Sequence, residues 1–318
     1  MKLIIPQTIA HLVEHRIPVV APETTIVRFD DDGNLTDDAS DAVALLRWWN
    51  PTPIFRKLLA AAPHLRWVHT PSAGVDHLLI PEIVESDILL TNSAGSHAIP
   101  IAEFVMMYML THVKRIDELK ALAPEDWEKG DEVRCNELHN TTLLIVGLGS
   151  IGEEIAKRAS AFGMRVVGSR RRVRPTPFVD LVVGDDGWRE LLPQADYVVI
   201  AAPLTEQTRG MVDGDAFARM KQGAYFINIA RGPIVDTDAL LAALHSGHLS
   251  GAAIDTPPIE PLPPEHPLWH APNTWVTPHI SYSSPRTRGR MMDIFIENLR
   301  RFRSGEQLVN VVDKHAGY

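Results

Sequence analysis

Three charged side chains in the last third of the chain have the chemistry to bind an anion and to move a proton. They are Arg231 in the segment Asn-Ile-Ala-Arg-Gly-Pro, Glu260 in the proline-rich segment that follows Asp255, and His279 in the segment Thr-Pro-His-Ile-Ser. Arginine binds carboxylates, histidine exchanges protons near neutral pH, and a neighbouring carboxylate stabilises imidazolium. Each segment follows an expected buried strand, and the carboxyl ends of parallel strands line one crevice. We therefore expect the three side chains to converge, although each alone is more often a turn residue, a solvated acid or a packed histidine.

A glycine-rich turn earlier in the chain predicts a binding site for a dinucleotide. It reads Gly147-Leu148-Gly149-Ser150-Ile151-Gly152, with an apolar strand before it and a helix after it. In the pattern G-x-G-x-x-G the first glycine permits a tight turn, the second lets a pyrophosphate approach the backbone, and the third lets the helix pack closely on the strand. The N–H groups at the start of the helix then attract the phosphates. The alternative is a plain strand–turn–helix.

The next strand runs into a basic cluster instead of ending in an acid. An acidic residue about 20 positions beyond the glycines is typical of sites that bind the ribose 2′-hydroxyl of NAD. Here Ser169 is followed by Arg170, Arg171 and Arg172. Guanidinium groups pair bidentately with phosphate, so the cluster favours the 2′-phosphate of NADP, with NAD still possible. The alternative is a solvated basic turn.

The elements that position these residues follow from short apolar runs that alternate with helical patterns. Strands are expected at residues 3–5, 44–48, 67–70 and 88–90, and helices at 8–16 and 53–62. A long helix at 103–119 precedes a polar, irregular stretch at 123–140. Further strands are expected at 142–146, 165–168, 197–201, 224–229, 251–254 and 275–277, with helices at 151–162 and 284–303. This alternation predicts an α/β fold whose parallel sheets are covered on both faces.

Length and composition exclude several classes of protein. The 318 residues correspond to about two domains, and a hydrophobic content of 45% excludes wholesale disorder. The net charge of −9 argues against a general nucleic-acid surface. The single cysteine, Cys135, forms no internal disulfide, which suggests a reducing compartment and a cytoplasmic protein. We expect neither a signal peptide nor a membrane span, because the apolar runs are too short.

No metal site is expected either. The segment from His11 to His15 fits the zinc pattern H-x-x-E-H, but no further set of ligands accompanies it.

The ordered arginine, glutamate and histidine behind the glycine turn resemble the D-2-hydroxyacid dehydrogenases. The resemblance covers nearly the whole chain and includes Trp-Val-His-Thr-Pro-Ser-Ala-Gly-Val-Asp at residues 67–76 and Ala-Pro-Leu-Thr at residues 202–205. It implies two Rossmann-like or flavodoxin-like domains, with a coenzyme domain at residues 98–282 inserted into a substrate domain of residues 1–97 and 283–318. It also implies a homodimer that forms through the helix at 103–119 and the stretch at 123–140.

The resemblance implies a role for each site residue. Arg231 would bind the carboxylate of a 2-oxo acid, His279 would donate a proton to its carbonyl oxygen, and Glu260 would hold the imidazole. Asp255 would bond to the nicotinamide carboxamide. Trp49, at the end of a strand near the expected cleft, could contact the substrate, and a packing role is an equal alternative. The backbone of Ser72, Ala73 and Gly74 would cradle the substrate carboxylate. The other coenzyme contacts would be the glycine turn, residues 169–171, Ala202, Pro203, Thr208, Ile229, Ala230 and Ser281, with Arg231 and His279 contributing as well.

The implied activity is NADPH-dependent reduction of a small 2-oxo acid, such as glyoxylate or hydroxypyruvate, to the D-2-hydroxy acid. Phenylpyruvate and other bulky oxo acids stay open as substrates. A phosphoglycerate-type dehydrogenase is a second enzyme hypothesis, which the basic cluster disfavours. A coenzyme-sensing binding protein, similar to the transcriptional corepressors that share this fold, is the alternative from a different class.

Overall fold

The computed structural model describes residues 1–317. The chain divides into two compact units: unit 1 consists of Met1–His97 and the chain from Ser284 onward, and unit 2 consists of Ala98–Ser283. Each unit is built around its own sheet, and every pairing of neighbouring strands in both sheets is parallel. The predicted α/β class with parallel sheets is confirmed.

Unit 1 contains a five-stranded sheet in the order β2-β1-β3-β4-β5. This is the flavodoxin-like order, which reverses between β1 and β3, and ligands of such sheets bind beyond the carboxyl ends of the strands at that reversal. The strands are β1 (Lys2–Pro6), β2 (Thr25–Phe29), β3 (Ala44–Leu46), β4 (Trp67–His69) and β5 (Leu89–Thr91). The helices are η1 (Gln7–Ile9), α1 (Ala10–Val13), α2 (Ile17–Val20), α3 (Thr52–Ala61), η2 (Asp76–Leu78), α4 (Pro81–Val84) and α11 (Thr287–Ser304).

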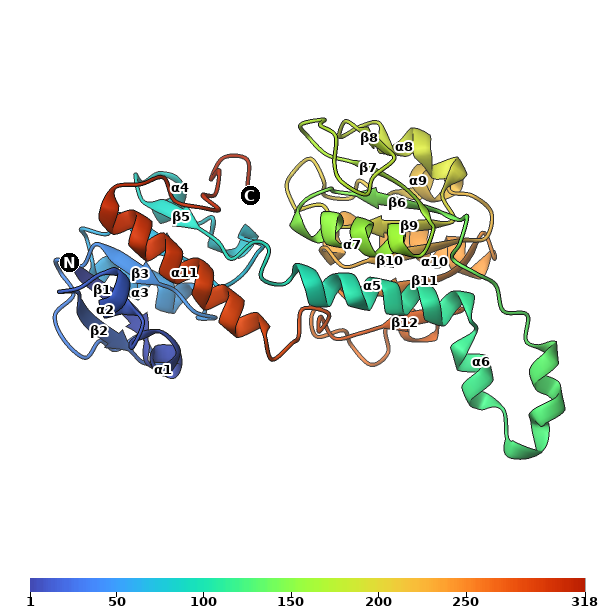
Figure 1. Ribbon diagram of the computed structural model, residues 1–318, viewed down its shortest axis with the longest axis horizontal. Coiled ribbons are helices and arrows are strands. Elements are labelled where there is room, and N and C mark those ends of the chain that lie inside the picture. Colours follow the sequence, from blue (N-terminus) through green and yellow to red (C-terminus); the bar gives the residue numbers. More distant parts are fainter. Residues whose placement is uncertain (318) are drawn as a thin grey trace. The chain divides into compact units, whose positions relative to one another are not determined.

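The two faces of this sheet are covered by different helices. Helix α11 lies along one face of the sheet (Figure 1). Successive strand residues point to opposite faces, so Leu3 packs in one cluster with residues of α11 and Ile4 in another with residues of α3. Trp67 of β4 stacks on Phe295 of α11, with ring centroids 5.6 Å apart and planes inclined by 15°. Burial on both faces fixes the register of the short strands. Their carboxyl ends are thereby held along one edge.

Unit 2 contains a seven-stranded sheet in the order β12-β11-β10-β9-β6-β7-β8. The order reverses between β6 and β9, as in doubly wound dinucleotide-binding sheets. The strands are β6 (Thr142–Val146), β7 (Arg165–Ser169), β8 (Leu181–Val183), β9 (Tyr197–Ile200), β10 (Ala224–Asn228), β11 (Leu249–Ile254) and β12 (Thr274–Val276). The helices are α5 (Ala98–Val113), α6 (Ile116–Ala121), η3 (Pro124–Glu132), α7 (Ser150–Ala161), α8 (Trp188–Leu191), η4 (Leu192–Gln194), α9 (Gly214–Arg219), η5 (Gly232–Ile234), α10 (Thr237–His245) and η6 (Pro267–His270).

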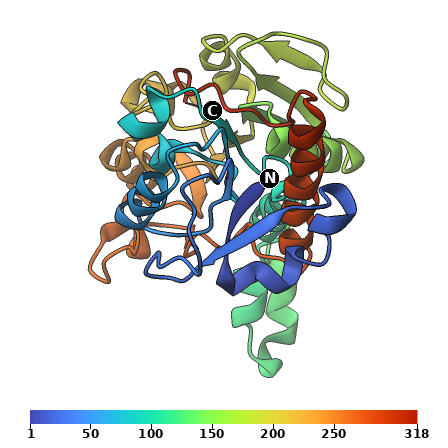
Figure 2. The same cartoon turned by 90° about the vertical axis from the view of Figure 1, so that its left-hand side faces the viewer.

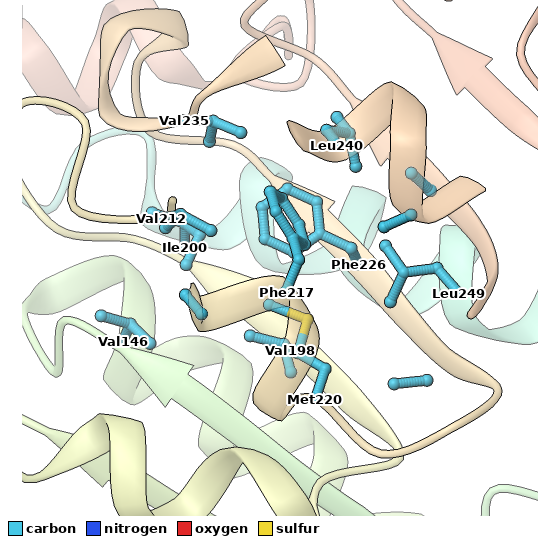
Figure 3. Close-up of a cluster of buried hydrophobic side chains, with 14 of the residues drawn as sticks. Val146, Val198, Ile200, Val212, Phe217, Met220, Phe226, Val235, Leu240 and Leu249 are labelled. Atoms are coloured by element: carbon cyan, nitrogen blue, oxygen red, sulfur yellow. The ribbon is translucent and has the colours of Figure 1, made fainter. Parts of the chain in front are cut away.

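A fully apolar cluster fixes the central strands of unit 2 against α9 and α10. Phe217 of α9 meets Phe226 of β10 edge to face, with ring centroids 5.3 Å apart (Figure 3). Val198 of β9 and Leu240 of α10 belong to the same cluster. Helices α5 and α7 belong to a second cluster on the opposite face. Packing on both faces holds the carboxyl ends of these strands in place.

The helix predicted at residues 103–119 is in fact two helices. Helix α5 begins at Ala98 and ends at Val113, and α6 begins after Arg115, whose φ of 50° is left-handed and breaks the helical path. Helices α6 and η3 project from unit 2 as an arm (Figures 1 and 2). Trp127 lies on this arm with 88% of its surface exposed.

The sequence patterns did not predict β2 or β8. Both are edge strands, and the burial of β8 is only partial. All the strands that the sequence predicted are present, and their ends differ from the prediction by at most two residues. The short helix predicted at 8–16 is divided among η1, α1 and the turn that follows them.

No helix in the described chain is both long and apolar enough to cross a bilayer. Residues 1–317 also hold no group of three or more metal-binding side chains. Within the H-x-x-E-H segment, Glu14 pairs with Arg28 of β2.

Candidate active site

The glycine turn between β6 and α7 has the geometry that its sequence pattern predicts. Gly147 has a φ of +108°, and a Cβ there would lie 2.6 Å from the backbone nitrogen of Ala202. A Cβ on Gly152 would lie 2.4 Å from the carbonyl oxygen of Gly147, so only glycine lets α7 pack this close. A Cβ on Gly149, by contrast, would meet no protein atom within 4 Å. Gly149 therefore leaves open space where a ligand can approach the backbone.

Helix α7 begins in this turn with no side-chain cap at Gly149. The first N–H groups of a helix have no intrahelical partner and carry partial positive charge. Ser150 is exposed and Leu148 is buried at this helix start. Open space beside Gly149 and uncapped N–H groups form the kind of cradle that binds a pyrophosphate. The residues present therefore fit a dinucleotide.

The basic cluster begins at the end of β7, which lies beside β6. The carbonyl oxygen of Ser169 accepts hydrogen bonds from the N–H groups of Gly147 (3.2 Å) and Leu148 (2.8 Å), which ties the strand end to the glycine turn. The guanidinium of Arg170 donates to Glu153 (3.2 Å) and to Thr176 (3.1 Å). Arg170 is therefore held inside the loop by protein partners.

Glu153 lies in the first turn of α7 and was not predicted from the sequence as a site residue. Its Oε1 also lies 3.4 Å from Arg174, so one carboxylate faces both Arg170 and Arg174. Arg171 and Arg172 are exposed. The only feature of the sequence that points to Glu153 is its position directly after Gly152, the third glycine of the turn.

The segment after β9 lies against the glycine turn. Ala201 donates its N–H to the carbonyl of Val146 (2.8 Å), at the reversal of the sheet. The Thr208 hydroxyl donates to the carbonyl of Pro203 (2.7 Å) and accepts from the N–H of Thr205 (2.8 Å). These bonds close the loop in which Ala202, Pro203 and Thr208 were predicted to contact a coenzyme.

Arg231 lies just beyond β10, in a segment shaped by its neighbours. Asn228 accepts from the N–H of Ala230 (3.1 Å) and donates to the carbonyl of Arg231 (3.1 Å). A Cβ on Gly232 would lie 2.2 Å from the carbonyl oxygen of Pro257. The Arg-Gly backbone is therefore pressed against the proline-rich segment that follows β11, which also carries Glu260. Ile229 is buried beneath this segment.

His279 and Glu260 form the central contact of the site. The Nδ1 atom of His279 lies 3.0 Å from Oε2 of Glu260. The histidine is 34% exposed and the glutamate 44%, so both reach solvent. With Nδ1 bonded to the carboxylate, Nε2 is left to face a substrate. The pair spans two neighbouring strands, because Glu260 follows β11 and His279 follows β12.

Asp255 anchors the loop that carries His279. It is completely buried, and its Oδ1 accepts from the Thr277 hydroxyl (2.7 Å) and the N–H of Ile280 (2.9 Å). Its Oδ2 accepts from the N–H (3.1 Å) and the hydroxyl of Ser281. The N–H of His279 donates to the Asp255 carbonyl (2.8 Å), which supports the left-handed φ of 49° at the histidine. This anchoring role was not predicted from the sequence.

In unit 1, the segment that begins beyond β4 carries Ser72, Ala73 and Gly74. The Ser72 hydroxyl lies 3.0 Å from that of Thr70, and Asn92 donates to the Ala73 carbonyl (2.8 Å). Trp49, beyond β3, is 51% exposed.

The buried His69 supports the segment that carries Ser72, Ala73 and Gly74. The two ring nitrogens of His69 lie 2.8 Å from the Thr91 hydroxyl and 3.1 Å from the Ser93 hydroxyl. Burial lowers the pKa of His69 to about 3, so the ring is neutral. Ser93 in turn donates to the Thr70 carbonyl (3.2 Å).

The geometry of unit 2 combines a nucleotide cradle, a strand-end arginine and a hydrogen-bonded carboxylate–histidine pair. The profile described as "D-isomer specific 2-hydroxyacid dehydrogenase, NAD binding domain" matches residues 106–281. A glyoxylate reductase from Thermofilum pendens is 36% identical over 265 residues, which cover 81% of this chain and 78% of the relative.

Two solved structures match the whole chain. A D-isomer specific 2-hydroxyacid dehydrogenase from Xanthobacter autotrophicus Py2, in complex with NADPH and MES, has a TM-score of 0.86 and 29% identity, covering 100% of this chain and 99% of that one. An NADPH-dependent glyoxylate/hydroxypyruvate reductase from Sinorhizobium meliloti, in complex with NADP and sulfate, has a TM-score of 0.84 and 30% identity, with the same coverage. The family acts on small 2-oxo or 2-hydroxy acids with a nicotinamide cofactor. The chain therefore belongs to the D-isomer specific 2-hydroxyacid dehydrogenases, a family of oxidoreductases.

Proposed function

We propose that this protein reduces a small 2-oxo acid, with glyoxylate and hydroxypyruvate as first candidates, to the D-2-hydroxy acid. The observation that carries the proposal is the 3.0 Å contact between His279 and Glu260, on a loop that Asp255 anchors beside the Arg231 segment. A hydrogen-bonded imidazole of this kind serves as a general acid. In this proposal unit 2 is the coenzyme domain and unit 1 the substrate domain.

The site residues divide the work as follows. The reduced nicotinamide, when bound, supplies the hydride. Arg231 binds the substrate carboxylate and stabilises the charge that develops on the carbonyl oxygen. His279 donates the Nε2 proton to that oxygen and takes it back in the oxidative direction. Glu260 accepts from Nδ1–H, which orients the ring and stabilises the imidazolium before the proton leaves.

The remaining assignments concern binding. The backbone N–H groups of Ser72, Ala73 and Gly74 cradle the substrate carboxylate, and Trp49 lines the substrate position. On the coenzyme side, the glycine turn holds the pyrophosphate. The rest of the coenzyme is lined by Ala202, Pro203, Thr208, Ile229, Ala230 and Ser281. The role expected for Asp255 at the nicotinamide carboxamide competes with its anchoring role, because the side chain is completely buried and both of its oxygens accept from Thr277, Ile280 and Ser281.

We further propose that NADPH is the preferred coenzyme. The strand end at Ser169 is followed by Arg170 and Arg171, and the matched structures from X. autotrophicus and S. meliloti were solved with NADPH and NADP. Arginine fits a 2′-phosphate better than a ribose hydroxyl. The guanidinium of Arg170 pairs with Glu153 in this structure, so a bound 2′-phosphate would compete with Glu153 for that guanidinium.

Unit 2 also carries features that support a homodimer. An apolar groove of about 440 Å³ between α5 and α7 is lined by side chains that include Met106, Met107, Leu110 and Phe162. Trp127 on the projecting arm exposes 88% of its surface. Apolar grooves and large exposed apolar side chains both mark interaction surfaces. A monomer mass in sedimentation analysis would contradict this part of the proposal.

The test is to follow the loss of reduced-coenzyme absorbance over a panel of 2-oxo acids, with NADPH and NADH in parallel. Turnover of glyoxylate or hydroxypyruvate with NADPH at higher kcat/KM than with NADH is the expected result. Equal or better use of NADH would reject the coenzyme preference. Turnover of none of the acids would reject the enzyme and favour a coenzyme-sensing binding protein.

A further inference from the structure

Tyr108 is a buried tyrosine of α5 whose hydroxyl meets the loop that carries His279. Only 1% of its surface is exposed, and its Oη lies 2.7 Å from the hydroxyl of Thr277, the first residue after β12. Its ring packs edge to face on Trp275 of β12, with ring centroids 6.1 Å apart. The contact joins a helix to a strand end that lies 169 residues further along the chain, so no local pattern in the sequence predicts it.

The direction of the hydrogen bonds beyond Tyr108 is fixed by Asp255. Both oxygens of Asp255 accept from the backbone N–H groups of Ile280 and Ser281, and such groups can only donate. The Thr277 hydroxyl, 2.7 Å from Oδ1 of Asp255, therefore gives its single proton to that oxygen. Its own oxygen is left to accept from Tyr108. The three side chains thus form one chain of donors that runs from Tyr108 through Thr277 to Asp255.

Tyr108 is suited to be the fixed donor at the start of this chain. Burial raises the pKa of its hydroxyl, and the negative charge of Asp255 adds to the rise, so the proton stays on the tyrosine. Hydrogen bonds in a chain polarise and strengthen one another. The acceptor that gains is the completely buried Asp255, whose charge would be costly to bury without such donors.

The far end of the chain holds the backbone at His279. This residue has a left-handed φ of 49°, which is uncommon for a residue other than glycine and persists only where the surrounding contacts hold it. The N–H of His279 donates to the carbonyl of Asp255 (2.8 Å). The side chain of Asp255 accepts from the next two N–H groups, and its Oδ1 is shared between Thr277 and Ile280. A shift of Thr277 is therefore passed directly to the loop that carries the imidazole.

We propose that Tyr108 is a positioning residue for the proton transfer at His279. The inference rests on the proposed function, because the role of His279 as general acid is assigned there. The hydroxyl of Tyr108 acts through Thr277 and Asp255, and these hold the loop where Nδ1 of His279 reaches Glu260. The competing role is structural, in which the hydroxyl only ties α5 to β12.

The first test is Tyr108→Phe, which removes the hydroxyl and keeps the ring beside Trp275. The single-turnover rate of NADPH oxidation by saturating glyoxylate should fall by about three- to tenfold, the scale of one lost hydrogen bond. The Kd of NADPH should stay within a few-fold of the parent. The matched control is Tyr197→Phe, because Tyr197 is another buried tyrosine of unit 2, whose hydroxyl lies 3.3 Å from Nδ1 of His112. A parental single-turnover rate in Tyr108→Phe, even with a lower Tm, would leave only the structural role and overturn the proposal.

Variants of Thr277 test whether Tyr108 acts through that hydroxyl. Thr277→Ser keeps the hydroxyl and should keep the parental rate. Thr277→Val removes it from a side chain of similar shape and should lower the rate by more than Tyr108→Phe does, because Asp255 also loses a donor. The double variant Tyr108→Phe/Thr277→Val should be no slower than Thr277→Val alone, because both substitutions break the same chain. Rate losses that multiply in the double variant would show that Tyr108 acts by another route and would overturn the proposal.

A signal from the His279 ring separates this inference from the proposed reaction. In protein with isotope-labelled histidine, the Cε1–Hε1 resonance of His279 is the one that His279→Gln removes. Tyr108→Phe should shift this resonance, whereas Tyr197→Phe should shift that of His112 and leave that of His279 in place. A shifted His279 resonance in a protein that reduces no oxo acid would support the positioning while rejecting the proposed function. An unshifted resonance in an enzyme that does reduce glyoxylate would reject the positioning alone.

Discussion

Nδ1 of His279 lies 3.0 Å from Oε2 of Glu260, although the two residues follow different strands of the sheet. The contact gives the imidazole a fixed orientation. Replacing His279 by Ala should lower the reductive kcat by about 10²- to 10⁴-fold, the range for loss of a general acid. Coenzyme affinity, measured by fluorescence titration, should stay within a few-fold of the parent.

Glu260→Gln separates orientation from charge at the same contact. Glutamine can still accept from Nδ1–H but carries no charge, so the variant keeps the orientation of the ring and loses the charge-assisted hydrogen bond. The reductive kcat for glyoxylate should fall by about 10-fold or more, the scale of one charged hydrogen bond. A parental kcat in Glu260→Gln would show that the charge of the contact does not serve catalysis.

Asp255→Asn tests the anchor of the His279 loop. The carboxylate accepts hydrogen bonds from Thr277, Ile280 and Ser281, and an amide accepts at one oxygen only. We expect a loss of about 1.5–3 kcal/mol in the free energy of unfolding for each charged bond that is lost, together with a lower kcat. Ser281→Ala, which removes one hydroxyl donor, should cost less. Parental stability and kcat in Asp255→Asn would contradict the anchoring role.

Two glycine substitutions should have opposite effects on coenzyme binding and folding. A Cβ on Gly149 meets no protein atom within 4 Å, so Gly149→Ala should keep the parental Tm. It should weaken NADPH binding by about 10-fold or more, because the methyl group occupies the approach to the backbone N–H groups. Gly152→Ala instead forces a contact at 2.4 Å and should cost about 1–3 kcal/mol of stability. The measurements are thermal unfolding and coenzyme titration. Intact NADPH binding in Gly149→Ala would refute the cradle.

Local patterns predicted the parts of this molecule that depend on neighbouring residues. The glycine turn was predictable because each glycine serves a contact within one strand–turn–helix unit. The anchoring by Asp255 was not, because its partners come from the loop after another strand. Strand β8 is wholly apolar but only three residues long, and so short a run does not distinguish a strand from a loop segment.

The same limit applies to charged residues. Nothing in the sequence singled out Arg47, and only the fold shows that it is buried. Glu153 was not singled out either, because its pairing with Arg170 requires β7 to lie beside β6. The pairing of Glu153 with Arg170 depends on neighbouring strands of the sheet, so it could not be predicted from local sequence patterns.

Glu153→Gln should sharpen the discrimination between NADPH and NADH. The substitution removes the carboxylate that pairs with Arg170 and Arg174, and thereby frees both guanidinium groups for a 2′-phosphate. The ratio of the NADH Kd to the NADPH Kd should rise by about two- to fivefold, the scale of a partly exposed ion pair. Glu154→Gln is the control, because Glu154 pairs with Arg158 instead. A fall in the ratio would show that Glu153 positions Arg170 for the phosphate.

His69 should make the protein less stable in acid. Burial lowers the pKa of His69 to about 3 in the folded state, whereas an unfolded histidine titrates near 6.5. Between these values the unfolded chain binds more protons, so the stability falls as the pH falls, by about 1.4 kcal/mol per pH unit, and this contribution is constant above pH 6.5. His69→Gln cannot take up the proton and should show a smaller drop in Tm between pH 7 and pH 5 than the parent. Some acid sensitivity should remain, because burial also lowers the pKa of His97 and of His112 to about 4. The exposed His64 provides the control, since His64→Gln should leave the parental pH dependence in place. If His69→Gln and the parent lost the same Tm on acidification, the buried ring would not be the group that is protonated on unfolding.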